Sequence, residues 1–243
     1  MTETDTIREP DTRLSIRRAA DRGPGGASWL DSRHTFSFGS YHDSNWMGFR
    51  NLRVINDDTV APGAGFPTHG HRDMEILTWP LEGAIEHKDS TGAGSVIRPG
   101  MMQAMSAGSG VTHSEFNHHT DRELRFLQIW ILPFVTGTTP TYAEVDFSDR
   151  LADGWTLVAS SDGERGSLKI KSEDRVFAAR PANGITIDFQ SAAGRGVWLH
   201  VARGRALVNG HELTAGDAIY SDDVDRLEAT GVEAAELLLF DLV

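Results

Sequence analysis

The chain has 243 residues, no cysteine and a formal net charge of -12 at pH 7. Without cysteine it can form no disulfide and no thiolate ligand, so nitrogen and oxygen atoms must hold any bound metal. The acidic charge argues against direct binding to nucleic acid, which requires clustered cations. The polar stretch from Met1 to Pro10 contains no apolar signal segment, and no apolar run reaches the ~20 residues of a membrane helix. A cytoplasmic protein without membrane contact is therefore expected.

The length allows one large β domain or two of about 100 to 150 residues. Near the N-terminus, Thr12 to Asp21 is the one segment whose pattern suggests a helix. Further along, His34 and His42 lie among aromatic residues. These two histidines could line the mouth of a pocket, but a packing role is equally compatible with the pattern.

Two histidine-rich segments then carry most of the chemistry. The first runs from Gly63 to Glu75 and contains His69 and His71; the second runs from Gly108 to Asn117 and contains His113 and Glu115. Residues two apart in a strand point to the same face, so each pair is expected to project together. A single histidine is usually a surface or hydrogen-bonded residue. Two such pairs facing each other would instead make a four-ligand pocket with open coordination positions, which is typical of a reactive metal site.

The fixed positions of both segments resemble the two signature motifs of cupins. The first motif is Gly63-x5-His69-x-His71-x3-Glu75, followed by Gly83, and the second is Gly110-x2-His113-x3-Asn117. The usual proline of the second motif is replaced here. Spacing alone does not choose between Glu75 and Glu115 as the carboxylate ligand.

A narrower resemblance, to the pirin family and its bacterial quercetinase-type members, covers roughly residues 28 to 135. The runs that carry it are His34-Thr35-Phe36-Ser37-Phe38-Gly39, Arg53-Val54-Ile55-Asn56, Phe66-x2-His69-x-His71-x-Asp73-Met74-Glu75-Ile76-Leu77, His87-x-Asp89-Ser90-x-Gly92 and Ser106-Ala107-Gly108-x-Gly110-x2-His113-Ser114-Glu115. This resemblance implies an all-β bicupin, with two double-stranded β-helix (jelly-roll) barrels and one metal, usually iron, in the N-terminal barrel. It places the metal ligands on His69, His71, His113 and Glu115, and leaves Glu75 as a nearby carboxylate.

The rest of the chain is consistent with two barrels. We expect an N-terminal barrel over residues 1–135, a linker over 136–154 and a C-terminal barrel over 155–243. Leu124 to Leu132 is β-rich and mostly apolar, as in a strand buried on both faces. Asn209-Gly210 between two short β-rich runs predicts a hairpin.

The two halves share a Gly-x5-Gly hairpin frame, at Gly94 to Gly100 and Gly210 to Gly216. An internal alignment on these frames transfers the four ligand positions to residues that cannot hold a metal. They are Gln190, Ala192, Ala229 and Gly231. The second barrel is therefore expected to lack metal, and its histidines, His200 and His211, to be ordinary surface or hairpin residues.

Several other residues are expected to serve the structure more than the chemistry. We assign His87 a structural role, His118 and His119 a solvated loop, and Met105 a place in the core. Trp130 and Phe126 are also expected in the barrel core. The acidic residues from Ala206 to Val243 predict a solvated face, with a docking surface for a basic partner as the minor alternative.

The resemblance implies a dioxygenase that opens flavonols such as quercetin with O2, with Glu115 as both ligand and catalytic base. The cofactor would be one divalent metal, Fe(II) first, although Ni, Mn, Co, Cu or Zn would accept the same ligands. A regulatory alternative is an iron-binding redox sensor that acts through contact with a protein partner. A third possibility is another dioxygen or isomerase reaction on a small enol. A monomer is expected in each case.

Overall fold

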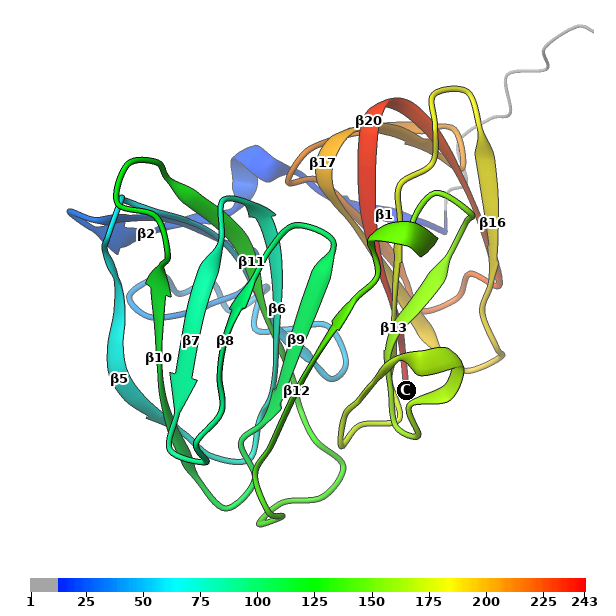
Figure 1. The fold of residues 1–243 in the computed structure, drawn as a ribbon. Helices are drawn as coiled ribbons and strands as arrows, with labels where there is room; N and C mark the ends of the chain where they lie inside the picture. The colour runs from blue at the N-terminus through cyan, green and yellow to red at the C-terminus, as the bar shows by residue number, and fades with distance from the viewer. Residues whose placement is uncertain (1–12) are drawn as a thin grey trace, which may run out of the picture.

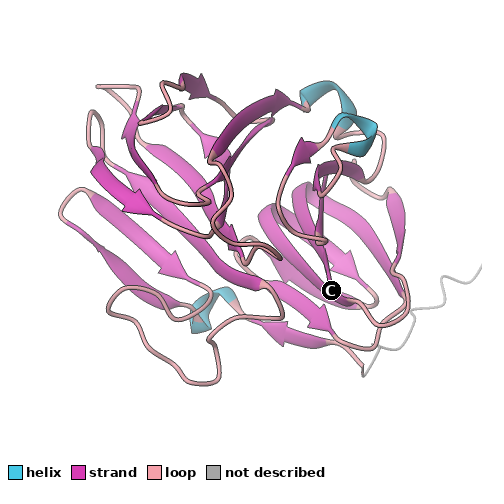
Figure 2. Cartoon of the chain, turned by 90° about the horizontal axis from the view of Figure 1, so that it is seen from below, coloured by secondary structure: helices cyan, strands magenta, loops and turns pink. Residues whose placement is uncertain are grey.

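A computed structural model describes residues 13–243 and places them in two β-barrels that lie side by side (Figure 1). Within this range there is no α-helix, only 3-10 turns at Ala19–Asp21, Ser148–Arg150 and Glu164–Gly166 (Figure 2). The expected all-β class is confirmed. No helix in the described part of the chain is long and apolar enough to span a membrane.

The helix expected between Thr12 and Asp21 is wrong for the residues that the structure describes. Ser15–Arg17 forms strand β1, which pairs with β19 (Ala218–Ser221), and the 3-10 turn Ala19–Asp21 follows it. Thr12 itself lies outside the described residues. The same residues also fit the alternating pattern of a short strand. Pairing with β19, which is far away in sequence, stabilises the strand.

The first barrel consists of a large and a small antiparallel sheet. The large sheet has the order β12-β9-β6-β11-β4-β3-β2 and the small one the order β5-β10-β7-β8. Their strands are β2 (Gly23–Ala27), β3 (Leu30–His34), β4 (Leu52–Val60), β5 (Gly65–His71), β6 (Glu75–Glu82), β7 (Ile85–Asp89), β8 (Gly94–Ile97), β9 (Met101–Ser106), β10 (Val111–Asn117), β11 (Leu124–Ile131) and β12 (Thr141–Asp146).

The second barrel is formed by one continuous sheet with the order β1-β19-β17-β20-β15-β13-β14, to which β16 and β18 add at β20 and β17. Its remaining strands are β13 (Thr156–Ser160), β14 (Leu168–Lys169), β15 (Arg175–Ala179), β16 (Thr186–Gln190), β17 (Gly196–Val208), β18 (His211–Thr214) and β20 (Arg226–Leu242). Val208 pairs with His211, and the turn residues Asn209 and Gly210 both have positive φ, at 44° and 83°. The hairpin predicted from Asn209-Gly210 is confirmed.

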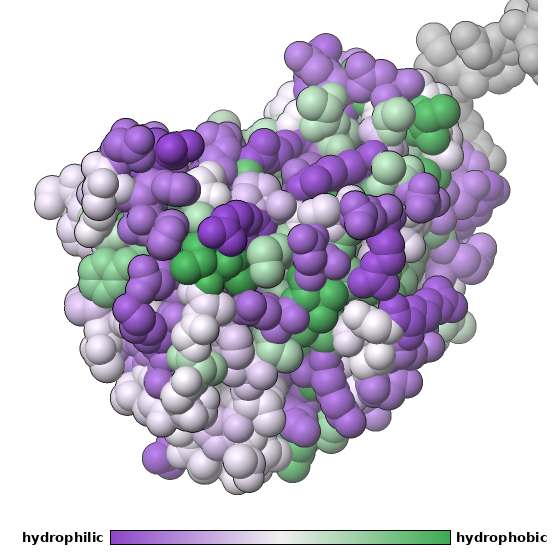
Figure 3. Space-filling model, viewed as in Figure 1, coloured by the Kyte–Doolittle hydropathy of each residue, from purple (hydrophilic) through white to green (hydrophobic). Residues whose placement is uncertain are grey.

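Strand β11 is buried on both faces, as its apolar sequence predicts. Phe126 and Ile129 are each 0% exposed, but they belong to different hydrophobic clusters. Ile129 packs in a core shared by the two barrels, together with Trp79 from the first and Trp198 from the second. Hydrophilic side chains cover most of the face in Figure 3, and hydrophobic ones form small separate groups there. The shared core holds the two barrels against each other.

Two segments cross the expected division of the chain. Within the predicted linker 136–154, β12 extends the sheet of the first barrel by pairing with β9, so that Tyr142 lies opposite Met105. At the other end, β1 adds to the second barrel, although it precedes the first in sequence. The alternating pattern of β12 spans only six residues, which is too short to predict a strand in this segment from the sequence. The precise domain boundaries stay a prediction.

A buried ionic cluster lies where β4 of the first barrel approaches β17 of the second. Arg125 donates to both carboxylate oxygens of Asp57 at 2.9 Å, and Arg22 lies 3.2 Å from the same carboxylate. His200 is 0% exposed, and neither of its ring nitrogens has a hydrogen-bond partner among the described residues. The expectation that His200 is a surface or hairpin residue is therefore wrong, because β17 runs through the centre of its sheet.

Candidate metal centre

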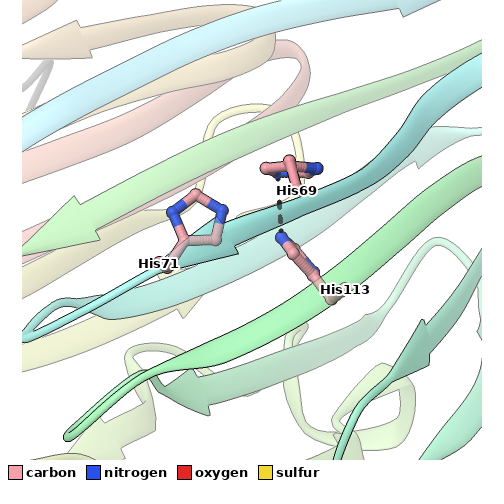
Figure 4. Close-up of side chains that lie close together, drawn as sticks. All are labelled: His69, His71 and His113. Carbon is pink, nitrogen blue, oxygen red and sulfur yellow. Dashed lines mark hydrogen bonds between the residues drawn. The ribbon is translucent and has the colours of Figure 1, made fainter.

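Three histidines converge on the small sheet of the first barrel. His69 and His71 are two residues apart on β5, and His113 lies directly opposite His69 on the neighbouring strand β10. The ring centroids of the three lie 4.5 to 4.8 Å from one another. Figure 4 shows the rings of His69 and His113 facing each other and His71 beside them. The shared face predicted from the His-x-His spacing is present.

The nitrogen atoms of this cluster are arranged as ligand atoms would be. Nε2 of His69 lies 3.1 Å from Nε2 of His113, and two ligands about 2.1 Å from one ion lie roughly 3 Å apart when they bind at right angles. Nδ1 of His69 lies 2.9 Å from the carbonyl oxygen of Pro67. Donation to that carbonyl fixes the tautomer in which Nε2 carries the free lone pair.

The surroundings of His71 and His113 keep these two imidazoles neutral. Burial, with the nearby His69 as a second cause, lowers the pKa of His113 to about 3 and the pKa of His71 to about 4. A neutral imidazole is the form that binds a metal. The three side chains therefore fit a divalent ion in their geometry, and His71 and His113 fit it in their protonation as well.

A β-bulge separates His113 from Glu115. Opposite these two residues of β10, the partner strand β5 advances from His69 to Phe66, so the register shifts between them. Bulges of this kind re-aim side chains and are frequent next to functional sites. The two strands approach so closely here that a Cβ atom on Gly65 would lie 2.3 Å from the carbonyl oxygen of Glu115. Only glycine fits at this position.

Glu115 is buried beside His113 and is held by neutral donors. Its Oε2 accepts from Gln128 Nε2 at 2.9 Å, and its Oε1 lies 3.4 Å from the Thr78 hydroxyl. Burial raises the pKa of the Glu115 carboxyl to about 7, although these hydrogen bonds oppose the rise. Its ligand atoms group with those of His113 and His87 within 4.8 Å, and it is not part of the three-histidine group.

His87 belongs to this neighbourhood, although its expected role was structural. Its Nδ1 lies 3.4 Å from Nδ1 of His113, and its Nε2 lies 3.0 Å from Asp89. The His-x-Asp spacing on a strand was the available signal, since it places the imidazole and its carboxylate on one face. Sequence reasoning missed the buried polar side chains around Glu115, namely Thr78, Gln103 and Gln128, and the half-buried Tyr142 that bonds Gln103.

Glu75 points away from the cluster. It accepts from the Ser106 hydroxyl at 2.6 Å and from the backbone N–H of Lys171, in the second half of the chain, at 3.0 Å. Its partners place it against the second barrel, as the nearby carboxylate that the resemblance implies.

An open hollow of ≈ 410 Å³ borders this cluster at His71, which lines it together with Arg72 and Thr112. The ring of Trp130 lies 5.1 Å from that of His71, and Phe38 packs on the other edge of Trp130 at 5.2 Å. Trp130 is half-buried and packs against a small core cluster that contains Ile76 and Met105, so it lies at the edge of the core and also borders the histidines.

The other residues singled out from the sequence lie either in the core or at the surface. Phe126 and Met105 are buried in the core, as predicted, and His118 is exposed beside Glu86. His34 is buried against Phe38, whereas His42 is exposed. In the described residues, the groupings of side chains able to hold a metal all lie in the first barrel.

Two packed β-barrels with a histidine cluster on one of them define a bicupin, in agreement with the expected fold. Residues 15–131 match the family model described as Pirin, and residues 157–242 match that of the quercetinase C-terminal cupin domain. The chain belongs to the pirin family.

Named relatives and a solved structure cover almost all of the chain. It is 42% identical over 229 residues to a protein of Escherichia coli K12 named quercetin 2,3-dioxygenase, an overlap of 94% of this chain and 98% of that one. It is 39% identical over 229 residues to a pirin-like protein of Caulobacter vibrioides, covering 91% and 98%. The crystal structure of the E. coli pirin YhhW in complex with nickel(II) superposes with a TM-score of 0.89 at 41% identity, covering 94% of this chain and 98% of that one.

Proposed function

We propose that this protein is a metal-dependent dioxygenase that opens the ring of a flavonol such as quercetin with O2. One observation carries the proposal. Three imidazoles, His69, His71 and His113, converge beside the buried carboxylate of Glu115, and His71 lines an open hollow. The similarity to a protein named quercetin 2,3-dioxygenase supports the choice of reaction and substrate.

The residues that would hold the metal are His69, His71, His113 and Glu115. Three neutral imidazoles and one carboxylate on a divalent ion leave a net charge of about +1 and open positions for substrate and O2. Fe(II) is the metal we propose, and the nickel(II) complex of a similar pirin supports a site that accepts other divalent ions. When bound, the ion would supply Lewis acidity that lowers the pKa of an enolic hydroxyl.

The protein's own side chains would perform the remaining steps. Glu115, held by Gln128 and Thr78, would take the proton of the flavonol 3-hydroxyl as general base. Trp130 and Phe38 would lie against the flat rings of the substrate and exclude water from the reacting carbon atoms. The ring would then open to a depside with release of carbon monoxide.

The test is turnover in the metal-loaded protein. Purified protein would be stripped with a chelator, reloaded separately with Fe(II), Ni(II) or Mn(II), and mixed with quercetin under air. We expect loss of quercetin matched by O2 uptake and release of carbon monoxide, and none of these in the stripped protein. Tight metal binding without turnover by any of the three metals would contradict the dioxygenase and favour the regulatory alternative.

A further inference from the structure

Tyr142 contacts the candidate centre by two separate routes, although it lies on β12 between the two barrels. Its ring stacks on His87, with centroids 4.6 Å apart and planes 19° from parallel. Its hydroxyl lies 3.2 Å from Gln103 Oε1 and 2.8 Å from Glu144 Oε2, and it also bonds the hydroxyl of Ser95. One side chain thus supports two different groups of the site.

The ring route leads to His113. His87 is held between Tyr142 on one face and Asp89 at its Nε2, at 3.0 Å. Its Nδ1 lies 3.4 Å from Nδ1 of His113, on the side of that imidazole opposite the nitrogen that faces His69. Groups in this position orient a metal-binding imidazole. Loss of the Tyr142 ring would remove one of the two contacts that hold His87, and so weaken the support behind His113.

The hydroxyl route leads to Glu115. Gln103 Oε1 is one of the acceptors of the Tyr142 hydroxyl, and Gln103 Nε2 donates to Thr78 Oγ1 at 3.2 Å. An amide has one accepting end and one donating end. A Tyr142 proton shared between Gln103 Oε1 and the nearer Glu144 carboxylate therefore favours the orientation in which Nε2 of Gln103 faces Thr78. Because Thr78 then accepts from Gln103, its single proton points onward, to Glu115 Oε1 at 3.4 Å or to Gln128 Oε1 at 3.2 Å.

Both directions of the Thr78 proton serve the same carboxylate, because Gln128 in turn donates to Glu115 Oε2 at 2.9 Å. Without the Tyr142 hydroxyl, the Gln103 amide could turn and present its oxygen to Thr78. Thr78 would then donate its proton to Gln103, and no longer to Glu115 or to Gln128. Burial, together with the nearby Glu144 carboxylate, raises the pKa of the Tyr142 phenol, which keeps it a donor.

We propose that Tyr142 is a positioning residue that holds His113 and Glu115 in the orientation needed to bind the metal. This inference rests on the proposed metal site, but not on the identity of the substrate. It assigns a role in the site to β12, the edge strand of the large sheet of the first barrel, which falls within the predicted linker 136–154.

The experiment measures Co(II) affinity by chelator competition and records the visible absorption spectrum of bound Co(II), which reports ligand geometry. Tyr142→Phe removes only the hydroxyl, and Tyr142→Leu removes the ring as well. Loss of groups that orient metal ligands typically costs 10- to 100-fold in affinity. We expect about 10-fold weaker binding for the Phe variant and about 100-fold for the Leu variant, each with an altered spectrum.

Three further variants sharpen the test. Tyr220→Phe makes the same chemical change against Trp198 in the second barrel and should leave affinity and spectrum unchanged. Glu144→Gln weakens the acceptor that lies 2.8 Å from the Tyr142 hydroxyl and competes for its proton, so affinity should be retained or improved. Gln103→Leu added to Tyr142→Phe should cost little beyond either single change, because both act along one route.

Wild-type affinity and spectrum in the Phe variant would overturn the hydroxyl route, and the same result in the Leu variant would overturn the ring route. If the Leu variant fails to fold, as judged by circular dichroism of the metal-free protein, the Phe variant and the Gln103 double variant still decide the hydroxyl route. A wild-type protein that binds no Co(II) would overturn the metal site and this inference together. The expected affinities in a protein that leaves quercetin intact would refute the dioxygenase alone.

Discussion

At the scale of single residues, two buried glutamates of the first barrel have different surroundings. Glu115 lies beside His113 and accepts from the neutral donors Gln128 and Thr78. Glu75 accepts from Ser106 and from the backbone of Lys171 in the second barrel. Motif spacing left both as candidate ligands. Their hydrogen-bond partners favour a catalytic role for Glu115 and a structural role for Glu75, which joins the two barrels.

Replacing each glutamate by glutamine separates these two roles. Glu115→Gln should retain part of the bound metal, because an amide oxygen can still coordinate, but should lose about 10²- to 10⁴-fold in flavonol turnover, because an amide cannot take a proton. The measurement is quercetin turnover per bound metal ion. Glu75→Gln, the matched control, should keep wild-type turnover per metal. Equal turnover in the two variants would contradict the role of Glu115 as base.

At the scale of secondary-structure elements, β4 and β17 approach each other at the buried ionic cluster, which contains charged side chains and the neutral His200. His200 on β17 faces the charges of Arg22, Asp57, Arg125 and Asp217. Burial, reinforced by the charge of Arg22, lowers its pKa to about 3. The folded protein therefore holds His200 neutral, whereas an unfolded chain protonates it near pH 6.5.

This difference predicts a loss of stability in acid. Above about pH 6.5 both states hold the imidazole neutral, so His200 contributes no pH dependence. Between about pH 6.5 and 3 the unfolded state binds one proton more, and the free energy of unfolding falls by up to about 1.4 kcal/mol per pH unit. His200→Leu should remove this slope while keeping stability at pH 7.5, because an apolar side chain needs no hydrogen-bond partner.

Urea denaturation at pH 7.5, 6.0 and 5.0 measures the effect. His118→Leu is the matched control, since it removes an exposed imidazole from a loop of the first barrel. An unchanged pH dependence in His200→Leu would show that His200 is not held neutral in the folded protein.

At the scale of the whole molecule, the metal is expected in one barrel only. The transferred ligand positions Gln190, Ala192, Ala229 and Gly231 offer no imidazole or carboxylate. The first barrel in turn is held by its sheets and by a core shared with the second, so removal of the metal should leave the fold intact. Elemental analysis should give one metal per chain, and the far-ultraviolet circular dichroism should be unchanged after chelation. Two metals per chain, or unfolding on chelation, would contradict this arrangement.

Local patterns predicted the parts of this molecule that depend on neighbouring residues. The shared face of His69 and His71 and the hairpin at Asn209-Gly210 follow from alternation and turn preference. The surroundings of His200 and Tyr142 depend instead on strands that are far apart in sequence. The residue pattern within β17 or β12 does not determine which strand will lie beside it. The burial of His200 and the contact of Tyr142 with the candidate site could therefore be found only from the structure.

The pairing of β1 with β19 also sets the order in which the protein can be completed. Ser15 pairs with Tyr220, so during synthesis the first strand waits until about 200 further residues have left the ribosome. At about 5 to 20 residues per second, that delay is roughly 10 to 40 s. Throughout it the nascent chain carries a strand whose partner does not yet exist, while the first barrel can already assemble. Strand β1, made before the first barrel, is thus among the last strands to find its partner.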